Sequence, residues 1–250
     1  PQDGPAHKKN RRGPSFDGYT AVGEGLFDYQ DVIGTAGRDV ADWAAGQTRG
    51  PIQVTGVPAA TPHGDFWQHI GLRPQPFAAA LVRAAGADSD LARQHPRQQR
   101  RWEAAKVHLE KLEAAPERRR HLDWLLERKA QALAAKGESN VLGRREAGWM
   151  QRMVEHETRQ AELWALRRGG DTLAGLLCWK SATFRYAYTI AYDASFAALS
   201  PGILALYALL RHTMREGCGF NFLTGEQEFK LRFATGRDAL LRYASLHPTH

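Results

Sequence analysis

Residues 186–236 read YAYTIAYDASFAALSPGILALYALLRHTMREGCGFNFLTGEQEFKLRFATG, and this stretch decides the fold class. The aromatic segment Arg185–Tyr192 is typical of a strand. A long apolar helix is predicted from Pro201 to Glu216, with Gly217 ending it. A short buried strand, Gly219–Leu223, follows. A helix between two strands in this order predicts an α/β domain.

The start of this helix is the first candidate site. Ser200 is predicted to cap the helix, and Pro201 takes the first helical position, where its missing N–H costs nothing. A helix N-terminus between two neighbouring strands presents free N–H groups and the positive end of the helix dipole. Ser200, Pro201 and Gly202 would therefore bind a phosphate or a developing oxyanion. The alternative interpretation is that these three residues only begin a core helix.

The sequence before this stretch predicts the remainder of the domain. Residues 93–136 are basic, with 12 Lys/Arg against six Asp/Glu. After residue 160 the pattern becomes strand-like and predicts three successive antiparallel strands. The predicted elements are a basic helix to about Arg101, a strand Lys106–Glu113, helices Pro116–Gly137 and Trp149–Gln160, and strands Glu162–Arg168, Leu173–Ser181 and Arg185–Tyr192.

The N-terminal part is less regular. Residues 1–18 are rich in proline, glycine and basic residues and are expected to form a flexible tail. Between 19 and 92, Gly and Pro interrupt short pieces: helical turns at Leu26–Ile33 and Val40–Ala45, a strand at Pro51–Val57, and Phe77–Ala84, which fits helix or strand. This region is expected to be the remnant of a second, similar half, with the complete domain at 93–240.

Composition excludes several classes of protein. The chain has 250 residues, 43% of them hydrophobic and 24% charged, which is typical of a globular protein. No run of 18 apolar residues is present, so no transmembrane helix is expected, and residues 1–18 lack the apolar core of a secretory signal. A cytoplasmic location is the resulting expectation. The net charge of +7 suits an anionic ligand such as a phosphate-bearing cofactor or RNA.

Cysteine and histidine give no reason to expect a disulfide framework or a metal site. Cys178 and Cys218 are too few for either a disulfide scaffold or a four-thiolate zinc site, and Cys178 is expected to be buried and inert. The ten histidines show no ligand spacing of the H-E-x-x-H type. His212 is expected to be a helix C-terminal residue rather than a catalytic base.

The pattern of residues 95–236 resembles the GNAT-superfamily acyltransferases of the CelD-like, cellulose-biosynthesis-associated type, which are related to Fem-type aminoacyltransferases. The resemblance implies a GNAT-type mixed, largely antiparallel sheet flanked by helices. The motifs that carry it are Tyr192-Asp193, Pro201-Gly202-Ile203-Leu204, Gly217, Phe220-Asn221-Phe222, Gly225-Glu226 and Phe229-Lys230-Leu231-Arg232-Phe233.

Two positions depart from the family pattern. The usual pyrophosphate loop, Gln/Arg-x-x-Gly-x-Gly/Ala, is replaced by Phe196–Gly202, which holds one glycine. The motif therefore does not establish coenzyme A binding. Asn221 stands where the family has Asp, and an amide cannot act as a base. The activity is impaired if that Asp is catalytic in relatives, and the change is mild if the Asp only orients the Lys loop.

The resemblance implies an N-acyltransferase in which an amine attacks an acyl thioester or ester directly. Lys230 would stabilise negative charge, Tyr192 (with Tyr188 as an alternative) would donate a proton, and Glu226 would act as a base or as a partner of Lys230. The donor, acyl-CoA or an acyl carrier, would bind at Ser200, Pro201, Gly202 and Ile203, with Arg232 beside Lys230. No metal is implied. The acceptor would be a small-molecule or glycan amine in exopolysaccharide or cell-envelope metabolism.

Two alternatives stay open. The basic stretch 93–136 and the Fem-type relatives favour aminoacyl transfer from tRNA, although interleaved acidic residues are equally typical of a solvated helix face. Asn221 and the missing glycines favour a catalytically weak partner or scaffold protein in a complex with biosynthetic proteins.

Overall fold

The computed structural model describes residues 19–20, 52–62, 64–138, 144–156 and 159–245. They fall into two compact units, one comprising residues up to Phe77 together with those from Leu240, and the other Ala78–Ala239. The second unit holds every residue of the predicted site. The expected tail 1–18 and the expected helical turns within 26–45 lie outside the described residues.

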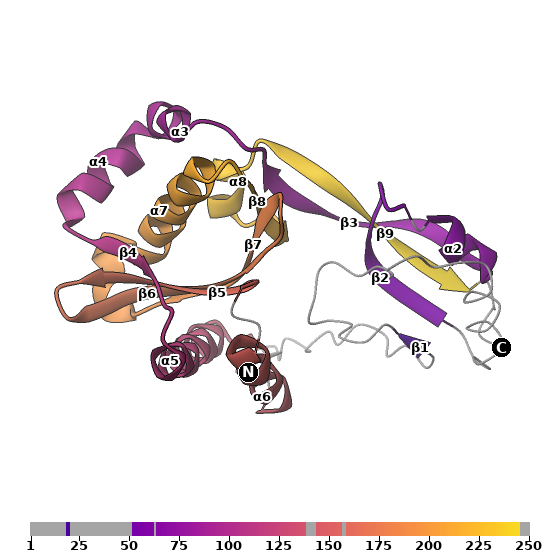
Figure 1. Cartoon of the computed structure of the whole chain (residues 1–250), viewed down its shortest axis with the longest axis horizontal. Helices are drawn as coiled ribbons and strands as arrows, with labels where there is room; N and C mark the ends of the chain where they lie inside the picture. Colours follow the sequence, from indigo (N-terminus) through magenta and orange to yellow (C-terminus); the bar gives the residue numbers. More distant parts are fainter. Residues whose placement is uncertain (1–18, 21–51, 63, 139–143, 157–158, 246–250) are drawn as a thin grey trace, which may run out of the picture. The chain divides into compact units, whose positions relative to one another are not determined.

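The larger unit is built on a mixed, mostly antiparallel sheet, which confirms the predicted fold class (Figure 1). Within this unit the strand order is β3-β8-β7-β6-β5-β4. Only the β7–β8 pair is parallel there. The strands are β3 (Leu72–Arg83), β4 (His108–Lys111), β5 (Ala161–Arg168), β6 (Asp171–Lys180), β7 (Phe184–Tyr192) and β8 (Gly219–Thr224). The segment at Phe77–Ala84, which fits helix or strand by sequence, belongs to a strand.

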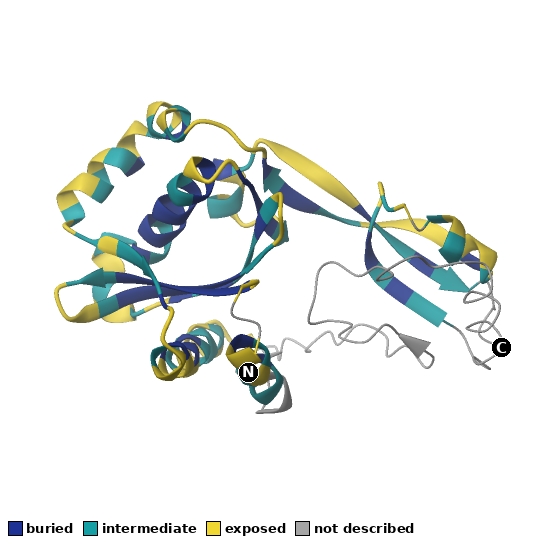
Figure 2. Ribbon diagram, in the orientation of Figure 1, coloured by how far each residue is buried: buried dark blue, intermediate teal, exposed yellow. Residues whose placement is uncertain are grey.

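Helices cover both faces of this sheet. Helix α7 (Pro201–Arg215) packs on one face, while α5 (Ala115–Ala134) and α6 (Arg144–His156) pack on the other (Figure 1). Helices α3 (Asp88–Gln94) and α4 (Pro96–Ala105) lie against α7. Because α7 is covered by the sheet and by α3–α4, it is buried along most of its length (Figure 2). An apolar sequence on all sides suits such a helix.

Two helix predictions need correction, and one helix buries a charged residue. The basic helix is interrupted at His95, where α3 ends and the proline of α4 begins a new helix. Helix α6 begins at Arg144, five residues before the predicted Trp149. The buried face of α5 includes Arg118 and His121 as well as Leu122 and Leu125. Arg118 can be buried because its guanidinium donates to the carbonyls of Leu112, Val154 and Ala161.

The smaller unit has a core of its own. Its elements are β1 (Tyr19–Thr20), β2 (Ile52–Pro58), α2 (Gly64–His69) and the end of β9 (Gly236–Ser245). Strand β2 pairs antiparallel with β9, and Val54, Val57, Leu72 and Tyr243 are buried together. The strand predicted at Pro51–Val57 is confirmed. Across the described ranges, no helix combines the length and the apolar content needed to cross a membrane.

Candidate functional site

The parallel strands β7 and β8 pair at their beginnings and then part. Their ladder runs from Phe184↔Gly219 to Tyr186↔Asn221, whereas β7 continues to Tyr192 and β8 to Thr224. On its other side β7 stays paired with β6 as far as Tyr192. Beyond Tyr186 and Asn221 the two backbones no longer pair with each other. In open α/β sheets ligands bind beyond the carboxyl ends of strands, and this splay is the candidate site.

A short connection joins the end of β7 to α7. It is the 3₁₀ helix η1 (Ala194–Leu199), and Asp193 caps it by accepting hydrogen bonds from the N–H and the hydroxyl of Ser195, at 2.9 and 2.7 Å. Asp193 also pairs with Arg128 of α5 at 3.1 Å. The hydrogen bonds from Ser195 and the charge of Arg128 hold the pKa of Asp193 below its usual value.

The start of α7 differs from the prediction at Ser200. Its backbone is left-handed, with φ of 52°, and its side chain makes no capping hydrogen bond. The Ser200 carbonyl instead accepts from the N–H groups of Ile203 and Leu204, at 3.0 and 3.2 Å. Pro201 has no N–H. Among residues 201–204, the N–H of Gly202 is the one that has no protein acceptor in the described structure.

This arrangement limits how the helix start can bind a phosphate. The amides of Ser195, Phe196 and Ser200 also have protein acceptors. The backbone of η1 and α7 therefore does not offer the ring of free amides that a pyrophosphate would need. The residues of the helix start do not by themselves fit coenzyme A, and a phosphate there requires side-chain cations.

Tyr192 and Gly202 lie together at the end of β7. Tyr192 is 46% exposed, although it is large and partly apolar. A Cβ atom added at Gly202 would lie 3.3 Å from Cδ1 of Tyr192 and 3.9 Å from Cδ1 of Ile190. The tyrosine ring therefore rests on the first turn of α7, next to the free amide of Gly202.

Lys230 lies at the end of the other strand. It belongs to α8 (Glu228–Phe233), and its Nζ donates to the carbonyl of Thr224, the last residue of β8. The last residues of β8 are held by Asn221, whose Oδ1 accepts from the N–H of Leu223 at 2.8 Å. Leu223 has a φ of 61°, so this bond holds a backbone conformation that leucine seldom adopts. Asn221 thus supports the end of β8, to which the Lys230 ammonium is bonded.

Two other predicted site residues have partners of their own. Glu226 forms an ion pair with Arg237, and Arg232 pairs with Glu228 at 3.4 Å. The structure therefore brings Tyr192 to Gly202 and Lys230 to the end of β8. Sequence reasoning missed Arg101, whose Nη2 donates to the carbonyl of Leu199 at 3.0 Å. Its place in the basic stretch was the one available signal.

A buried ion pair closes the narrow end of the splay. Arg185 is fully buried within the paired part of β7, and its Nε donates to Glu162 of β5 at 2.6 Å. Its Nη2 donates to Glu216, which follows α7, at 2.9 Å, and its Nη1 donates to Thr213. Burial opposes ionisation of Glu162, but the hydrogen bond and charge of Arg185 outweigh it and lower the pKa of Glu162. This cluster ties three elements together.

Two residues that the sequence analysis did not assign to the site, Cys178 and His212, lie where it predicted. Cys178 is buried, and burial raises the pKa of its thiol. His212 lies in the last turn of α7 and contacts Glu216 at 2.9 Å. No group of three or more His, Cys, Asp or Glu side chains in the described part of the chain is arranged to hold a metal ion.

Comparison with known proteins identifies the family. The sequence matches the family model described as "Acetyltransferase (GNAT) domain" over residues 72–231. Among curated proteins, no sequence matches significantly.

Solved structures share the fold at low sequence identity. FemX has a TM-score of 0.61 and 11% identity, covering 82% of this chain and 74% of that one. The C-terminal DUF2156 domain of a putative lysylphosphatidylglycerol synthetase from Agrobacterium fabrum has a TM-score of 0.59 and 14% identity, covering 84% and 73%. L-PGS from Bacillus licheniformis has a TM-score of 0.57 and 13% identity, covering 83% and 71%.

Proposed function

The chain belongs to the acetyltransferase (GNAT) domain family, and from this premise we propose that it transfers an acyl group from a thioester donor to an amine by direct attack. The observation that carries the proposal is the splay of β7 and β8, with Tyr192 at the end of one strand and Lys230 anchored at the end of the other. The donor's acyl group lies between the two strand ends. In this proposal the amide of Gly202 and the ammonium of Lys230 act on the same carbonyl oxygen of the donor.

The reaction needs no covalent enzyme intermediate. The amine nitrogen bonds to the acyl carbon, and the carbonyl electrons move to oxygen, giving a tetrahedral oxyanion. The Gly202 amide and Lys230 stabilise that charge, as preorganised donors do in other acyl transfers. The C–S bond then breaks, and the leaving sulfur takes the proton of the Tyr192 hydroxyl. The new ammonium loses its proton to Glu226, whose carboxylate releases it to solvent, and the Tyr192 phenolate takes a proton from solvent to complete the cycle.

The remaining predicted residues hold the donor. The backbone of Ser200, Pro201, Gly202 and Ile203 would lie beneath the donor without cradling its phosphates. Arg232, which pairs with Glu228, would add positive charge to the helix that carries Lys230. Asn221 acts in this proposal through the end of β8 that it supports and not as a base. The CelD-like assignment, and with it an amine acceptor in exopolysaccharide or cell-envelope chemistry, belongs to the same proposal.

A second candidate is aminoacyl transfer from tRNA. It is favoured by the fold shared with FemX and by Arg97 and Arg100, which lie exposed on α4 without acidic partners in the described structure. Phosphates of a nucleic acid bind to such cations. The chemistry at the splay is unchanged in this case, except that the bond broken is C–O.

The test is a donor and acceptor screen with the full chain. Release of free thiol from acetyl-CoA or longer acyl-CoA, dependent on an added amine, supports the first candidate. Transfer from aminoacyl-tRNA, with binding that weakens as salt is raised, supports the second. If neither donor reacts and a stable protein partner is captured, the chain acts as a non-catalytic partner and the proposed reaction is wrong. Tyr192→Phe serves as the reduced-activity control.

A further inference from the structure

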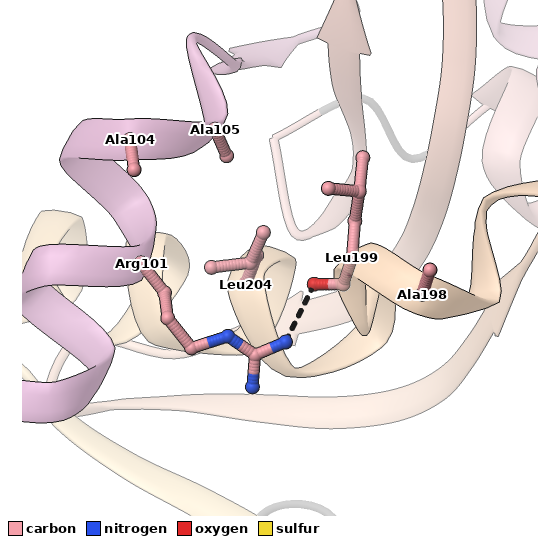
Figure 3. A pocket seen from close by; sticks show the side chains of 6 residues that line it. All are labelled: Arg101, Ala104, Ala105, Ala198, Leu199 and Leu204. Carbon is pink, nitrogen blue, oxygen red and sulfur yellow. Dashed lines mark hydrogen bonds between the residues drawn. The ribbon is translucent and has the colours of Figure 1, made fainter.

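Two short helices follow the two strands of the splay, and an arginine from another element bonds to the end of each. Helix η1 follows β7 and α8 follows β8, and each has six residues. The carbonyl of Leu199, the last residue of η1, accepts from Nη2 of Arg101 at 3.0 Å (Figure 3). The carbonyl of Phe233, the last residue of α8, accepts from Nη1 of Arg83 at 2.9 Å. Positive charge suits this end of a helix, where carbonyls lack partners within the helix.

The two arginines differ in their surroundings. Arg101 lies in the wall of a small cavity that opens to solvent (Figure 3). Arg83, the last residue of β3, is 4% exposed, and its Nη2 donates to Oε1 of Gln94 at the end of α3. Among the described residues no ion pair joins Arg83 to a carboxylate. Burial lowers the pKa of Arg83, and the charge of Asp90 only partly offsets this effect. A guanidinium buried in this way is better suited to fixing a position than to adding stability.

The element that Arg83 fixes is α8. A helix of six residues is not stable by itself, so tertiary contacts decide where it lies. The ring of Phe233 is fully buried and lies 4.9 Å from the ring of His95, between ring centres. Two residues later, the N–H of Thr235 donates to the carbonyl of Val82 at 2.8 Å. Strand β3 therefore holds the end of α8 through the Arg83 side chain and through a neighbouring backbone bond.

Lys230 lies between this anchor and the end of β8. Its ammonium donates to the carbonyl of Thr224. Its own carbonyl accepts at 2.9 Å from the N–H of Ala234, which follows α8 directly. Strand β3 also pairs with β8, where Arg83 stands opposite Phe220. A shift of the end of α8 relative to these strands would therefore move Lys230.

We propose that Arg83 is a positioning residue for the reaction, which fixes the end of α8 and thereby holds the ammonium of Lys230 at the carbonyl oxygen of the donor. The inference rests on the proposed function. In it, Arg83 contacts neither donor nor acceptor and acts through α8. A displacement of about 1 Å can cost about 100-fold in rate. Loss of Arg83 should therefore lower kcat much more than it changes the KM of the donor.

The experiment is a double-mutant cycle on the full chain. Arg83→Met, Lys230→Ala and the double variant are compared for kcat and for the KM of the donor, acyl-CoA or aminoacyl-tRNA, that the wild type uses. Arg118→Met is the matched control, since Arg118 is 1% exposed and also donates to three backbone carbonyls, on the α5 side of the sheet. Urea unfolding checks that each variant folds. Arg83→Lys, which keeps the charge, takes the place of Arg83→Met if that variant does not fold.

Arg83→Met is expected to lower kcat at least about tenfold when Lys230 is present, and less than about threefold in the Lys230→Ala background, because the positioned group is then absent. Arg83→Lys should lower kcat less than Arg83→Met, since one ammonium can still donate to the carbonyl of Phe233 but lacks the second arm of the guanidinium. Arg118→Met should change kcat by the same factor in both backgrounds. A general loss of stability would not produce this difference between the two arginines.

Hydrogen exchange followed by mass spectrometry tests the anchor without turnover. The amides of Lys230 and Leu231 are bonded to the Gln227 carbonyl, and that of Ala234 to the Lys230 carbonyl. These amides should exchange at least about tenfold faster in Arg83→Met than in the wild type, and within about threefold of the wild type in Arg118→Met.

The inference is overturned if folded Arg83→Met keeps the wild-type kcat, if it loses the same factor in both backgrounds, or if exchange in α8 is unchanged. The proposed function fails separately, when the wild type transfers no acyl group or when Lys230→Ala turns over like the wild type. Faster exchange in α8 together with that failure would show that Arg83 anchors the helix and has no part in the reaction.

Discussion

The ring of Tyr192 lies so close to the backbone of Gly202 that a methyl group there would be 3.3 Å from Cδ1 of the ring. Contacts of this length require the neighbouring atoms to shift. Gly202→Ala should therefore displace Tyr192 and crowd the one free amide of the helix start. We expect kcat for acyl transfer to fall about tenfold or more, with thermal stability nearly unchanged because Tyr192 is 46% exposed. A variant with wild-type kcat would contradict the role of this contact.

Tyr192→Phe tests the hydroxyl alone. The phenyl ring keeps its place against Gly202, while the proton donor is lost. Removal of a general acid costs about 10²- to 10⁴-fold in rate, and kcat should fall within that range. The loss should shrink with a donor whose leaving thiol is more acidic, because such a group departs without a proton. Equal losses with good and poor leaving groups would assign Tyr192 to binding.

Lys230→Ala removes the proposed electrostatic donor at the end of β8. Turnover should fall about 100-fold or more, as when a comparable donor is lost elsewhere. Lys230→Arg should recover part of the rate, since it keeps the charge but not the shape of the ammonium. Lys136→Ala, which removes an exposed lysine at the end of α5, is the control. If Lys230→Ala turns over like the control, the site assignment fails.

Arg185→Met tests the buried ion pair. It leaves the carboxylate of Glu162, which is 2% exposed, without its main partner. Breaking such a pair costs about 3–5 kcal/mol, to be measured as the free energy of unfolding in urea. Adding Glu162→Gln should restore part of the loss, because the unpaired charge is then gone. A cost below about 1 kcal/mol for Arg185→Met would show that the cluster is solvated in solution.

His121 predicts a pH dependence of stability. Burial, partly offset by a hydrogen bond to the carbonyl of Trp164, lowers its pKa to about 4. Between pH 6.5 and 4 the unfolded chain therefore binds the proton first, and stability falls as the pH is lowered through this window. The full loss is about 3 kcal/mol. Urea titrations at pH 7 and pH 4.5 should show most of this difference in the wild type and a smaller one in His121→Gln.

Local pattern predicted most of the elements. Several signals act over a few residues: the apolar runs of β5 and β6, the aromatic run of β7, the apolar length of α7, the prolines in the first turns of α5 and α7, and the left-handed glycine after α7. Two parts of the site depend on equally local signals: Tyr192 at the end of a strand and Gly202 at the start of a helix. The sequence could therefore predict both.

Tertiary structure decided the contacts between residues that lie far apart in the sequence. Nothing near Gly175 in the sequence predicts that His121 packs over it, with Nε2 only 2.6 Å from where a Cβ would lie. Arg101 meets the Leu199 carbonyl across 98 residues of chain, and Ser200 precedes α7 in a left-handed conformation without a side-chain cap. Partners are chosen once the sheet and helices have packed, because a buried polar group must then bond to whatever lies within reach. Sequence alone therefore determined the elements, and packing determined the partners that make them a site.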